Sequence, residues 1–259
     1  MQQTDRLTKR LLDPGADPAP VEDIAPARPS SLLFVCEHAG RAVPQALGDL
    51  GLSPREMDRH IAWDIGAEPV ARRLASAVGA RLVLQRYSRL VIDCNRPPLG
   101  TGSIPGTSDG TTIPGNLGLS DDDKSARVAE IFEPFAGACS AAAADPGIRA
   151  AYSIHSFTPT MNGRDRPWHI GFCARQPDSG ASELAERFRL ANPDLTVAVN
   201  EPYQIDDETD WFIPRVAEPR GVLHALIEIR NDLIASPEGQ ALWGDWLADL
   251  FLSMPETSP

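Results

Sequence analysis

Two short apolar runs along the chain each end close to a histidine. The run over 31–36 (SLLFVC) leads to His38, and the run over 150–154 (AAYSI) leads to His155. Short apolar runs that contain β-branched and aromatic residues predict buried strands. Because ligands of open α/β sheets gather where strands end, we expect both histidines to face one crevice.

The remaining pattern alternates helical and extended segments. Helical spacing predicts one long helix over 54–78, with Ser53 as its N-cap and Gly79 at its end. A second helix is expected over 120–144, where three aspartates follow Ser120 and favour a helix N-terminus. Further strands are expected over 81–85, 89–92, 148–154, 168–174, 195–199 and 222–229, and further helices over 180–191 and 238–252. This alternation predicts a three-layer α/β/α fold with a mixed central sheet.

The chain is expected to form a single domain over residues 30–259, preceded by a loosely ordered arm over residues 1–29. Residues 97–118 contain four Pro and six Gly, too many for a regular element. A long loop in a compact domain is usually either a lid or disordered. We favour a lid, because this loop directly follows Asn95 and Arg96.

Composition excludes several classes of partner. The net charge is −12, which argues against nucleic acid and anionic membrane surfaces. No stretch approaches the ~20 apolar residues of a membrane span, and the N-terminus lacks an apolar signal core. The four cysteines are dispersed, which favours reduced thiols. We therefore expect a soluble cytoplasmic protein; the sequence leaves its oligomeric state open.

The two histidines are candidate metal ligands, because neutral imidazole is a preferred ligand of zinc. Three protein ligands plus water are typical of a catalytic zinc, so we expect one acid beside His38 and His155. Asp64 is preferred to Glu37, which would point away from His38 if the strand continued. His60, four residues before Asp64 on the expected helix, is an alternative ligand. A turn histidine or a surface hydrogen bond would explain each residue without a metal.

The last predicted strand carries Glu228 and Arg230 on its polar face, about 7 Å apart. An acid in an apolar strand is costly to bury unless it is paired or used. Glu228 is therefore either the ion-pair partner of Arg230 or a general base beside a metal-bound water.

The segment Asn95-Arg96 ends another predicted strand. An arginine fork recognises carboxylate, and asparagine supplies a neighbouring donor. Arg89 could polarise a carbonyl oxygen, or it could form an internal salt bridge with Asp93. Ser156, next to His155, and Arg230 are further candidate substrate-binding residues.

Seven motifs together resemble the N-formylglutamate amidohydrolase family. They are spread over residues 31–234: C36-EHAG-R41, H60-IAWDIGA-67, Y87-SRLVIDCNRP-97, S103-IP with I113-PGN-116, S153-IHSFTP-159, N200-EPY-203 and L226-IEIRNDLI-234. The resemblance implies a fold like that of zinc-dependent exopeptidases and phosphorylase–hydrolases, with one zinc ion per chain. It implies hydrolysis of N-formyl-L-glutamate to formate and L-glutamate, an activity of histidine degradation.

The Asp-x-Asn-Arg string over 93–96 is also similar to the carboxylate-binding motif of aspartoacylases and zinc carboxypeptidases. By that resemblance Asn95 and Arg96 hold the α-carboxylate, Arg89 assists the oxyanion and Glu228 is the base. Those enzymes usually have Glu three residues after the first ligand histidine, where this chain has Arg41. Ser153 stands where formylglutamate hydrolases often have Asp.

Three alternatives remain open at this point. A cell-wall-type N-acyl-alanine amidase or a zinc carboxypeptidase would use the same scaffold with a peptide substrate. A non-catalytic protein that binds acyl amino acids would keep the pocket and lose the chemistry. The expected partner in the leading interpretation is a small anionic acyl-amino-acid substrate.

Overall fold

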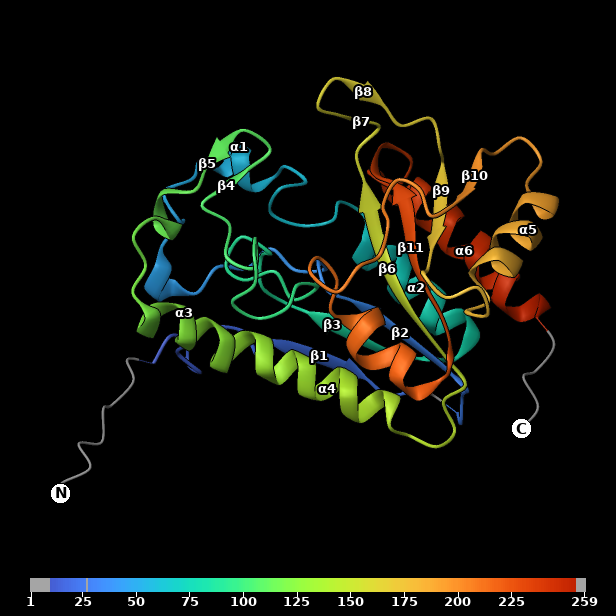
Figure 1. The fold of residues 1–259 in the computed structure, drawn as a ribbon, viewed down its shortest axis with the longest axis horizontal. Coiled ribbons are helices and arrows are strands. Elements are labelled where there is room, and N and C mark those ends of the chain that lie inside the picture. The colour runs from blue at the N-terminus through green and yellow to red at the C-terminus, as the bar shows by residue number, and fades with distance from the viewer. Residues whose placement is uncertain (1–9, 27, 255–259) are drawn as a thin grey trace.

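The computed structural model describes residues 10–26 and 28–254. A seven-stranded sheet of order β1-β3-β2-β6-β11-β9-β10 forms its centre (Figure 1). Strands β3, β2, β6 and β11 are mutually parallel, whereas β1 and β9 pair antiparallel with β3 and β11. The strands are β1 Val21–Ile24, β2 Leu32–Cys36, β3 Arg81–Gln85, β6 Ala150–Phe157, β9 Ile170–Cys173, β10 Val197–Val199 and β11 Leu223–Arg230. The predicted mixed central sheet is thus confirmed.

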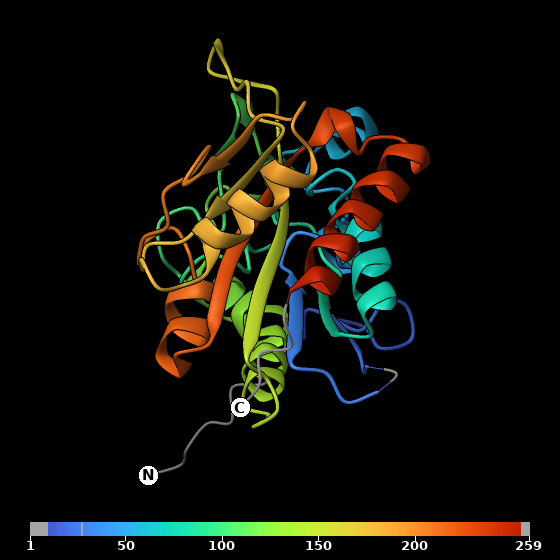
Figure 2. The same cartoon turned by 90° about the vertical axis from the view of Figure 1, so that its right-hand side faces the viewer.

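Helices cover both faces of this sheet. Helices α2 (Ala67–Val78) and α6 (Pro237–Ser253) stack on one face (Figure 2), and α5 (Ala181–Ala191) packs beside them. The other face is covered by a continuous helical segment of α3 (Asp121–Arg127), the π-helical turn η3 (Val128–Phe132) and α4 (Glu133–Ala143). The α/β/α layering follows from the alternation of apolar patterns along the chain.

Two short hairpins and several short helical turns lie outside these layers. Two hairpins lie outside the central sheet, β4–β5 (Thr107–Ser108 and Thr111–Thr112) and β7–β8 (Thr160–Met161 and Arg164–Asp165). The remaining helical turns are α1 Pro54–Met57, η1 Gln45–Leu47, η2 Pro114–Asn116, η4 Ile213–Ala217, η5 Glu218–Arg220 and η6 Asn231–Leu233.

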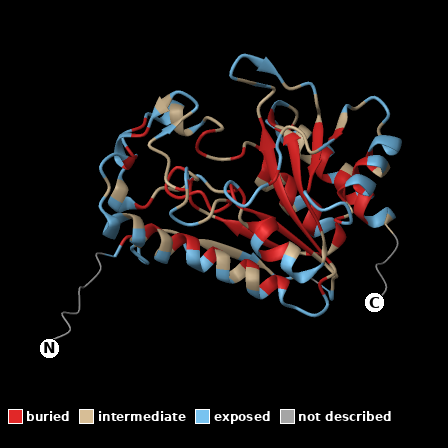
Figure 3. Ribbon diagram, in the orientation of Figure 1, coloured by how far each residue is buried: buried red, intermediate tan, exposed pale blue. Residues whose placement is uncertain are grey.

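Burial is concentrated in the central strands, and the outer helix faces are exposed (Figure 3). Side chains of β6 and β11 alternate between two cores, one under α2, α5 and α6 and one under α3–α4. All four cysteines are buried and free, as expected for reduced thiols. None of the helices in the described part of the chain has the length and apolarity needed to cross a bilayer.

Local end signals in the sequence agree with the structure. Ser53 and Ser120 both cap helices by accepting a hydrogen bond from the backbone N–H three residues later. Each belongs to a capping box, completed by Glu56 and Asp123. Gly79 ends α2 with φ of 71°, a left-handed conformation that glycine adopts at little cost.

Two predicted elements over 54–92 are wrong. The helix predicted over 54–78 is interrupted between Met57 and Ala67, so His60 and Asp64 do not share a helix face. The intervening backbone instead pairs with other segments: Asp64 N–H donates to His38 O, and Ala62 O accepts from Arg89 N–H. The strand predicted over 89–92 is a series of turns, whose residues are apolar because the turns are buried.

The predicted arm over 1–29 is more ordered than expected where it is described; residues 1–9 and 27 lie outside the described residues. Val21–Ile24 forms the edge strand β1, paired with β3, and Leu11 N–H donates to the Glu130 carboxylate at 2.6 Å. A short strand with mixed polarity gives little periodic signal, so pairing with the β3 edge decided its structure.

The loop over 97–118 contains the hairpin β4–β5 and is held at its far end by Asn116. This side chain donates to Leu90 O and Pro105 O and accepts from the buried Arg127 guanidinium, at 2.7–2.8 Å. The loop is thus anchored at 116 and carries hydrogen-bonded structure; its role as a lid stays a prediction.

The packing of α2 against the sheet can be tested at Leu74, a fully buried residue of that helix. We expect Leu74→Ala to lower the free energy of unfolding by about 2–5 kcal/mol, because it removes buried methyl groups and leaves a cavity. Urea unfolding measures this change. Leu190→Ala, on the exposed side of α5, is the control and should change it by less than about 0.5 kcal/mol. Equal effects in the two variants would contradict the packing described.

Candidate active site

Three parallel strands deliver the central side chains to the same edge of the sheet. His38 lies two residues beyond β2, while His155 and Glu228 lie near the ends of β6 and β11, where they are register partners. The carboxyl ends of β2, β6 and β11 lie at the same edge of the sheet, because these strands are adjacent and parallel. His38, His155 and Glu228 therefore meet at the strand ends, where the sequence predicted a crevice.

His38, Asp64 and His155 form a buried cluster whose potential ligand atoms all lie within 4.8 Å of one another. The Asp64 Oδ2 atom is 2.8 Å from His155 Nδ1 and 3.4 Å from His38 Nδ1. Asp64 is therefore the acid that approaches both histidine rings, as the sequence analysis preferred. Two nitrogens and one carboxylate oxygen form a set of donors that could bind a metal ion.

Carboxylates also lie against the outer nitrogens of both rings. His38 Nε2 is 2.7 Å from Asp93 Oδ1, and His155 Nε2 is 3.1 Å from Glu37 Oε2. Protons placed on these outer nitrogens would leave both Nδ1 lone pairs facing the carboxylate of Asp64. Three converging electron-pair donors are stable in a buried site only with a cation or a proton between them. Carboxylate–histidine pairs of this kind orient metal ligands, so the residues fit a metal ion.

Neighbouring charges stabilise the ionised forms of Asp64 and His155. Burial by itself would raise the pKa of Asp64, but the adjacent histidines hold it well below its usual value. Desolvation would likewise lower the pKa of His155, but Glu37 and Asp64 raise it well above the usual value. Ser153 fixes Glu37 by donating from Oγ to Oε2 at 2.5 Å. The serine thereby orients an acid supplied by a neighbouring strand end.

Arg89 joins the two acids of the site. Its guanidinium donates twice to Asp93 Oδ2, at 2.6 and 3.1 Å, and once to Asp64 Oδ1, at 3.3 Å. The expected internal salt bridge with Asp93 is therefore present. These bonds occupy three of the five N–H donors of an arginine, which leaves two for a ligand. Although Asp93 is buried, the charges of Arg89 and His38 keep its pKa far below the usual range.

Glu228 is only 4% exposed, and its Oε2 atom has no hydrogen-bond partner among the described residues. Desolvation raises the pKa of its carboxyl group to about 8, against the opposing charge of His155. A cation bound at the cluster would lower that value. A buried carboxyl with a vacant oxygen beside a candidate metal site is placed to exchange protons with a small ligand.

Asn95 and Arg96 also line the cavity, but their side chains are engaged differently. The Asn95 amide donates to Asp210 Oδ1 at 3.1 Å and accepts from the Trp211 and Phe212 N–H groups. Asn95 thus holds the segment that follows residue 209. Arg96 forms an ion pair with Asp93, with Nε 3.6 Å from Oδ2, and its guanidinium makes no hydrogen bond in the part of the chain described.

Three other candidates have different environments. Ser156 lines the cavity; its N–H donates to Asp64 Oδ2 and its hydroxyl to Ile65 O, so it fixes the ligand segment. Arg230 is not among the lining residues and pairs with Asp232, so the Glu228–Arg230 pair considered from the sequence is absent from the described residues. His60 lines the cavity 3.5 Å from Asp109, outside the cluster.

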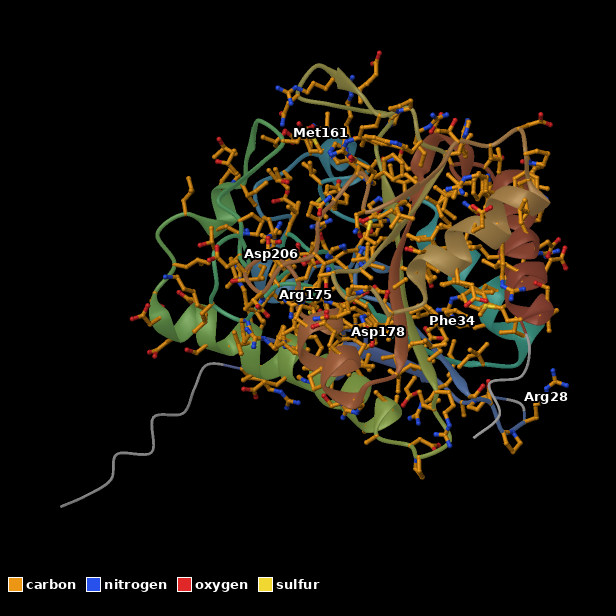
Figure 4. All side chains as sticks on the ribbon, turned by 45° about the vertical axis from the view of Figure 1, so that its right-hand side comes forward. Arg28, Phe34, Met161, Arg175, Asp178 and Asp206 are labelled. Carbon is orange, nitrogen blue, oxygen red and sulfur yellow. The ribbon has the colours of Figure 1, made fainter. Side chains whose placement is uncertain are left out.

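The cavity has a volume of about 400 Å³. Further lining residues are Ser108 and Asp109 in the loop over 97–118, Met161 and Asn162 on the β7–β8 hairpin, and the residues 203–205, 209 and 210. The loop was predicted to be a lid beside the site, and Tyr203 belongs to one of the family motifs, whereas the β7–β8 hairpin was not connected with the site from the sequence. Met161 and Asp206, on two of these segments, are marked in Figure 4. The Asn162-Gly163 pair, with positive φ at both residues, is a hairpin signal that could have predicted β7–β8; its position over the cavity had no local signal.

Comparison with protein-family models places the chain among the amidohydrolases. The model described as N-formylglutamate amidohydrolase matches residues 30–235. The chain therefore belongs to the N-formylglutamate amidohydrolase family, and the resemblance of its motifs is confirmed. Membership supports a hydrolase acting on amide bonds.

Solved structures give the same fold. A gene product of Agrobacterium tumefaciens is 38% identical, with 93% of this chain and 96% of that chain covered and a TM-score of 0.86. N-formylglutamate amidohydrolase from Ralstonia eutropha is 21% identical, with 90% and 96% covered and a TM-score of 0.68. The search among curated proteins finds no match.

The cluster predicts how metal binding responds to substitution. We expect the cluster to bind one divalent metal ion, and we expect His38→Ala and His155→Ala to lose most of that binding, since each removes a nitrogen ligand. Asp93→Asn should weaken metal binding by about 10–100-fold, because it alters the group that orients His38. Metal analysis after dialysis and competition with a chelator measure both effects. Native metal content in both histidine variants would contradict the ligand assignment; His169→Ala, outside the cavity lining, is the control.

Proposed function

We propose that this protein is a zinc-dependent hydrolase of N-acylated acidic amino acids, and that N-formyl-L-glutamate, cleaved to formate and L-glutamate, is its leading substrate. The ligand set would be His38, Asp64 and His155, with one zinc ion per chain. Family membership supports the amide-bond reaction; the ligand chemistry supports the metal.

The proposal depends on one observation: three kinds of functional group line the same cavity. The buried His–Asp–His cluster, the carboxyl of Glu228 with its vacant oxygen and the guanidinium of Arg96 all line it. A volume of about 400 Å³ suits an amino-acid derivative. A protein that only bound acyl amino acids would have no need to retain both a buried base and a complete ligand set.

Zinc, when bound, supplies a Lewis acid and a water of lowered pKa. The residues of the chain supply the other functions. Glu228 takes a proton at Oε2 and returns it to the leaving amine, because its carboxyl is desolvated and unpartnered. The two remaining N–H donors of Arg89 are available to stabilise negative charge on the formyl oxygen. Arg96 binds the α-carboxylate through its terminal nitrogens, and Asn95 holds the adjoining wall.

Glu228→Gln keeps the shape of the side chain and removes its ability to carry a proton. We expect kcat for N-formylglutamate to fall about 100-fold or more, with little change in KM and full metal content. Steady-state kinetics and metal analysis on the zinc-loaded protein measure this. Near-native turnover would mean that the base lies elsewhere. Glu133→Gln, an exposed change on α4, is the matched control and should leave kcat unaltered.

Arg96→Lys keeps the positive charge but loses the planar fork that pairs with a carboxylate. We expect KM to rise about tenfold, with a smaller effect on kcat, because one ammonium cannot reproduce two parallel hydrogen bonds. The loss should nearly vanish for the substrate analogue whose α-carboxylate is an amide. Arg55→Lys, an exposed change on α1, should behave as the native chain. An equal loss with both substrates would exclude the α-carboxylate role.

A substrate panel separates this proposal from its rivals. N-formylglutamate, short peptides and muramoyl peptides are assayed with the same zinc-loaded preparation. Turnover confined to peptides would assign a carboxypeptidase or cell-wall amidase, and binding of acyl amino acids without turnover across the panel would assign a non-catalytic role. A small anionic substrate is favoured here, because the guanidinium of Arg96, which makes no hydrogen bond among the described residues, lines a cavity of limited volume.

A further inference from the structure

The β7–β8 hairpin forms a rim of the cavity. It directly follows β6, the strand that carries His155, and its residues Met161 and Asn162 are among the lining residues. The hairpin projects beyond the end of the sheet (Figure 1). Its base is closed by a hydrogen bond of 2.8 Å from Arg166 N–H to Pro159 O. The backbone of Arg166 is thereby fixed next to the cavity wall.

The Arg166 side chain lies on two aromatic residues of that wall. Its guanidinium carbon is 5.0 Å from the ring centroid of Tyr203 and 5.9 Å from that of Phe157. Its Nη1 atom donates to the Tyr203 hydroxyl at 3.1 Å. Both rings line the cavity. Stacking on aromatic rings restricts a guanidinium to a plane and leaves its edge free for hydrogen bonds.

Arg166 has no carboxylate partner among residues 10–26 and 28–254. Its charge nevertheless reaches the site, because it is one of the groups that lower the pKa of Glu228. Among the described residues, the hydrogen-bond acceptor of the Arg166 side chain is the Tyr203 hydroxyl. Arg166 is not itself among the lining residues, but it contacts two residues that are, so most of its five N–H donors are available to an anion bound beside those rings.

An acidic acyl-amino-acid substrate carries two carboxylates and needs two cationic partners. Arg96 is assigned to the α-carboxylate above, and Arg89 is committed to Asp93 and Asp64. Arg230, predicted from the sequence as a substrate-binding residue, is paired with Asp232. The second carboxylate thus lacks a partner among these arginines.

We infer that Arg166, held in place by Tyr203 and Phe157, binds the side-chain carboxylate of the substrate and gives the enzyme its preference for acidic amino acids. This inference rests on the proposed function, which it deepens. The aromatic support would restrict the guanidinium before binding, which lowers the entropy cost of recognition. Arg166 would act as a specificity residue, without part in bond cleavage.

The test compares N-formylglutamate with N-formylglutamine, whose side chain has the same shape without the charge. In the zinc-loaded Arg166→Gln variant, kcat/KM for N-formylglutamate should fall about tenfold or more, while that for N-formylglutamine changes less than about threefold. Tyr203→Phe, which removes the hydroxyl acceptor and keeps the ring, should lower the preference in the same direction by a smaller factor. Arg164→Gln, on the exposed strand of the same hairpin, should leave the preference unchanged.

Calorimetric binding of L-glutamate and L-glutamine supplies a readout that does not depend on turnover: Arg166→Gln should weaken binding of glutamate alone. A native preference for glutamate in Arg166→Gln, or an equal loss with both substrates, would overturn the inference and leave the proposed function standing. Failure of the native protein to hydrolyse either formyl substrate would overturn both. Thermal unfolding of each variant identifies a general loss of structure, in which case Tyr203→Phe decides.

Discussion

The carboxylate of Asp64 is the constraint on which the rest of the site depends. It is buried, and it is contacted by both histidine rings, by Arg89 and by the Ser156 N–H group. A buried carboxylate is costly without such partners. Its position requires the backbone before α2 to leave the helix and donate to His38 O. The broken helix is therefore a consequence of placing this acid between the strand ends.

Around Asp64, acidic and basic side chains alternate in a series of contacts. Arg89 neutralises Asp93, Asp93 contacts His38, and Glu37 contacts His155. These contacts give the buried carboxylates of Asp93 and Glu37 polar partners at 2.6–3.1 Å, which offsets the cost of burying them. Arg41 is not part of this series of contacts and pairs with the exposed Asp58. It stands three residues after His38, where aspartoacylases and zinc carboxypeptidases usually have Glu.

The cavity wall has a different origin from the cluster. The cluster is built on strand ends and the turns next to them, whereas much of the wall comes from two hairpins and from the segment after β10. Rigid strands hold the groups that must be precisely placed, and loops supply the groups that choose the substrate. Members of a family can therefore share the cluster and differ in the amino acid they accept.

The sequence by itself determined the layers, the strands β2, β6 and β11, the helix caps and the family, because these depend on local periodicity and on motifs of contiguous residues. It also singled out His38, His155 and Glu228, since polar residues at the ends of apolar strands are conspicuous. The sequence also favoured Asp64 over Glu37 and His60, but only the tertiary structure brought it against both histidines. Only the tertiary structure decided that Arg230 does not line the cavity and that Arg166 lies by its wall. Those outcomes depend on pairing between segments distant along the chain, which no local pattern records.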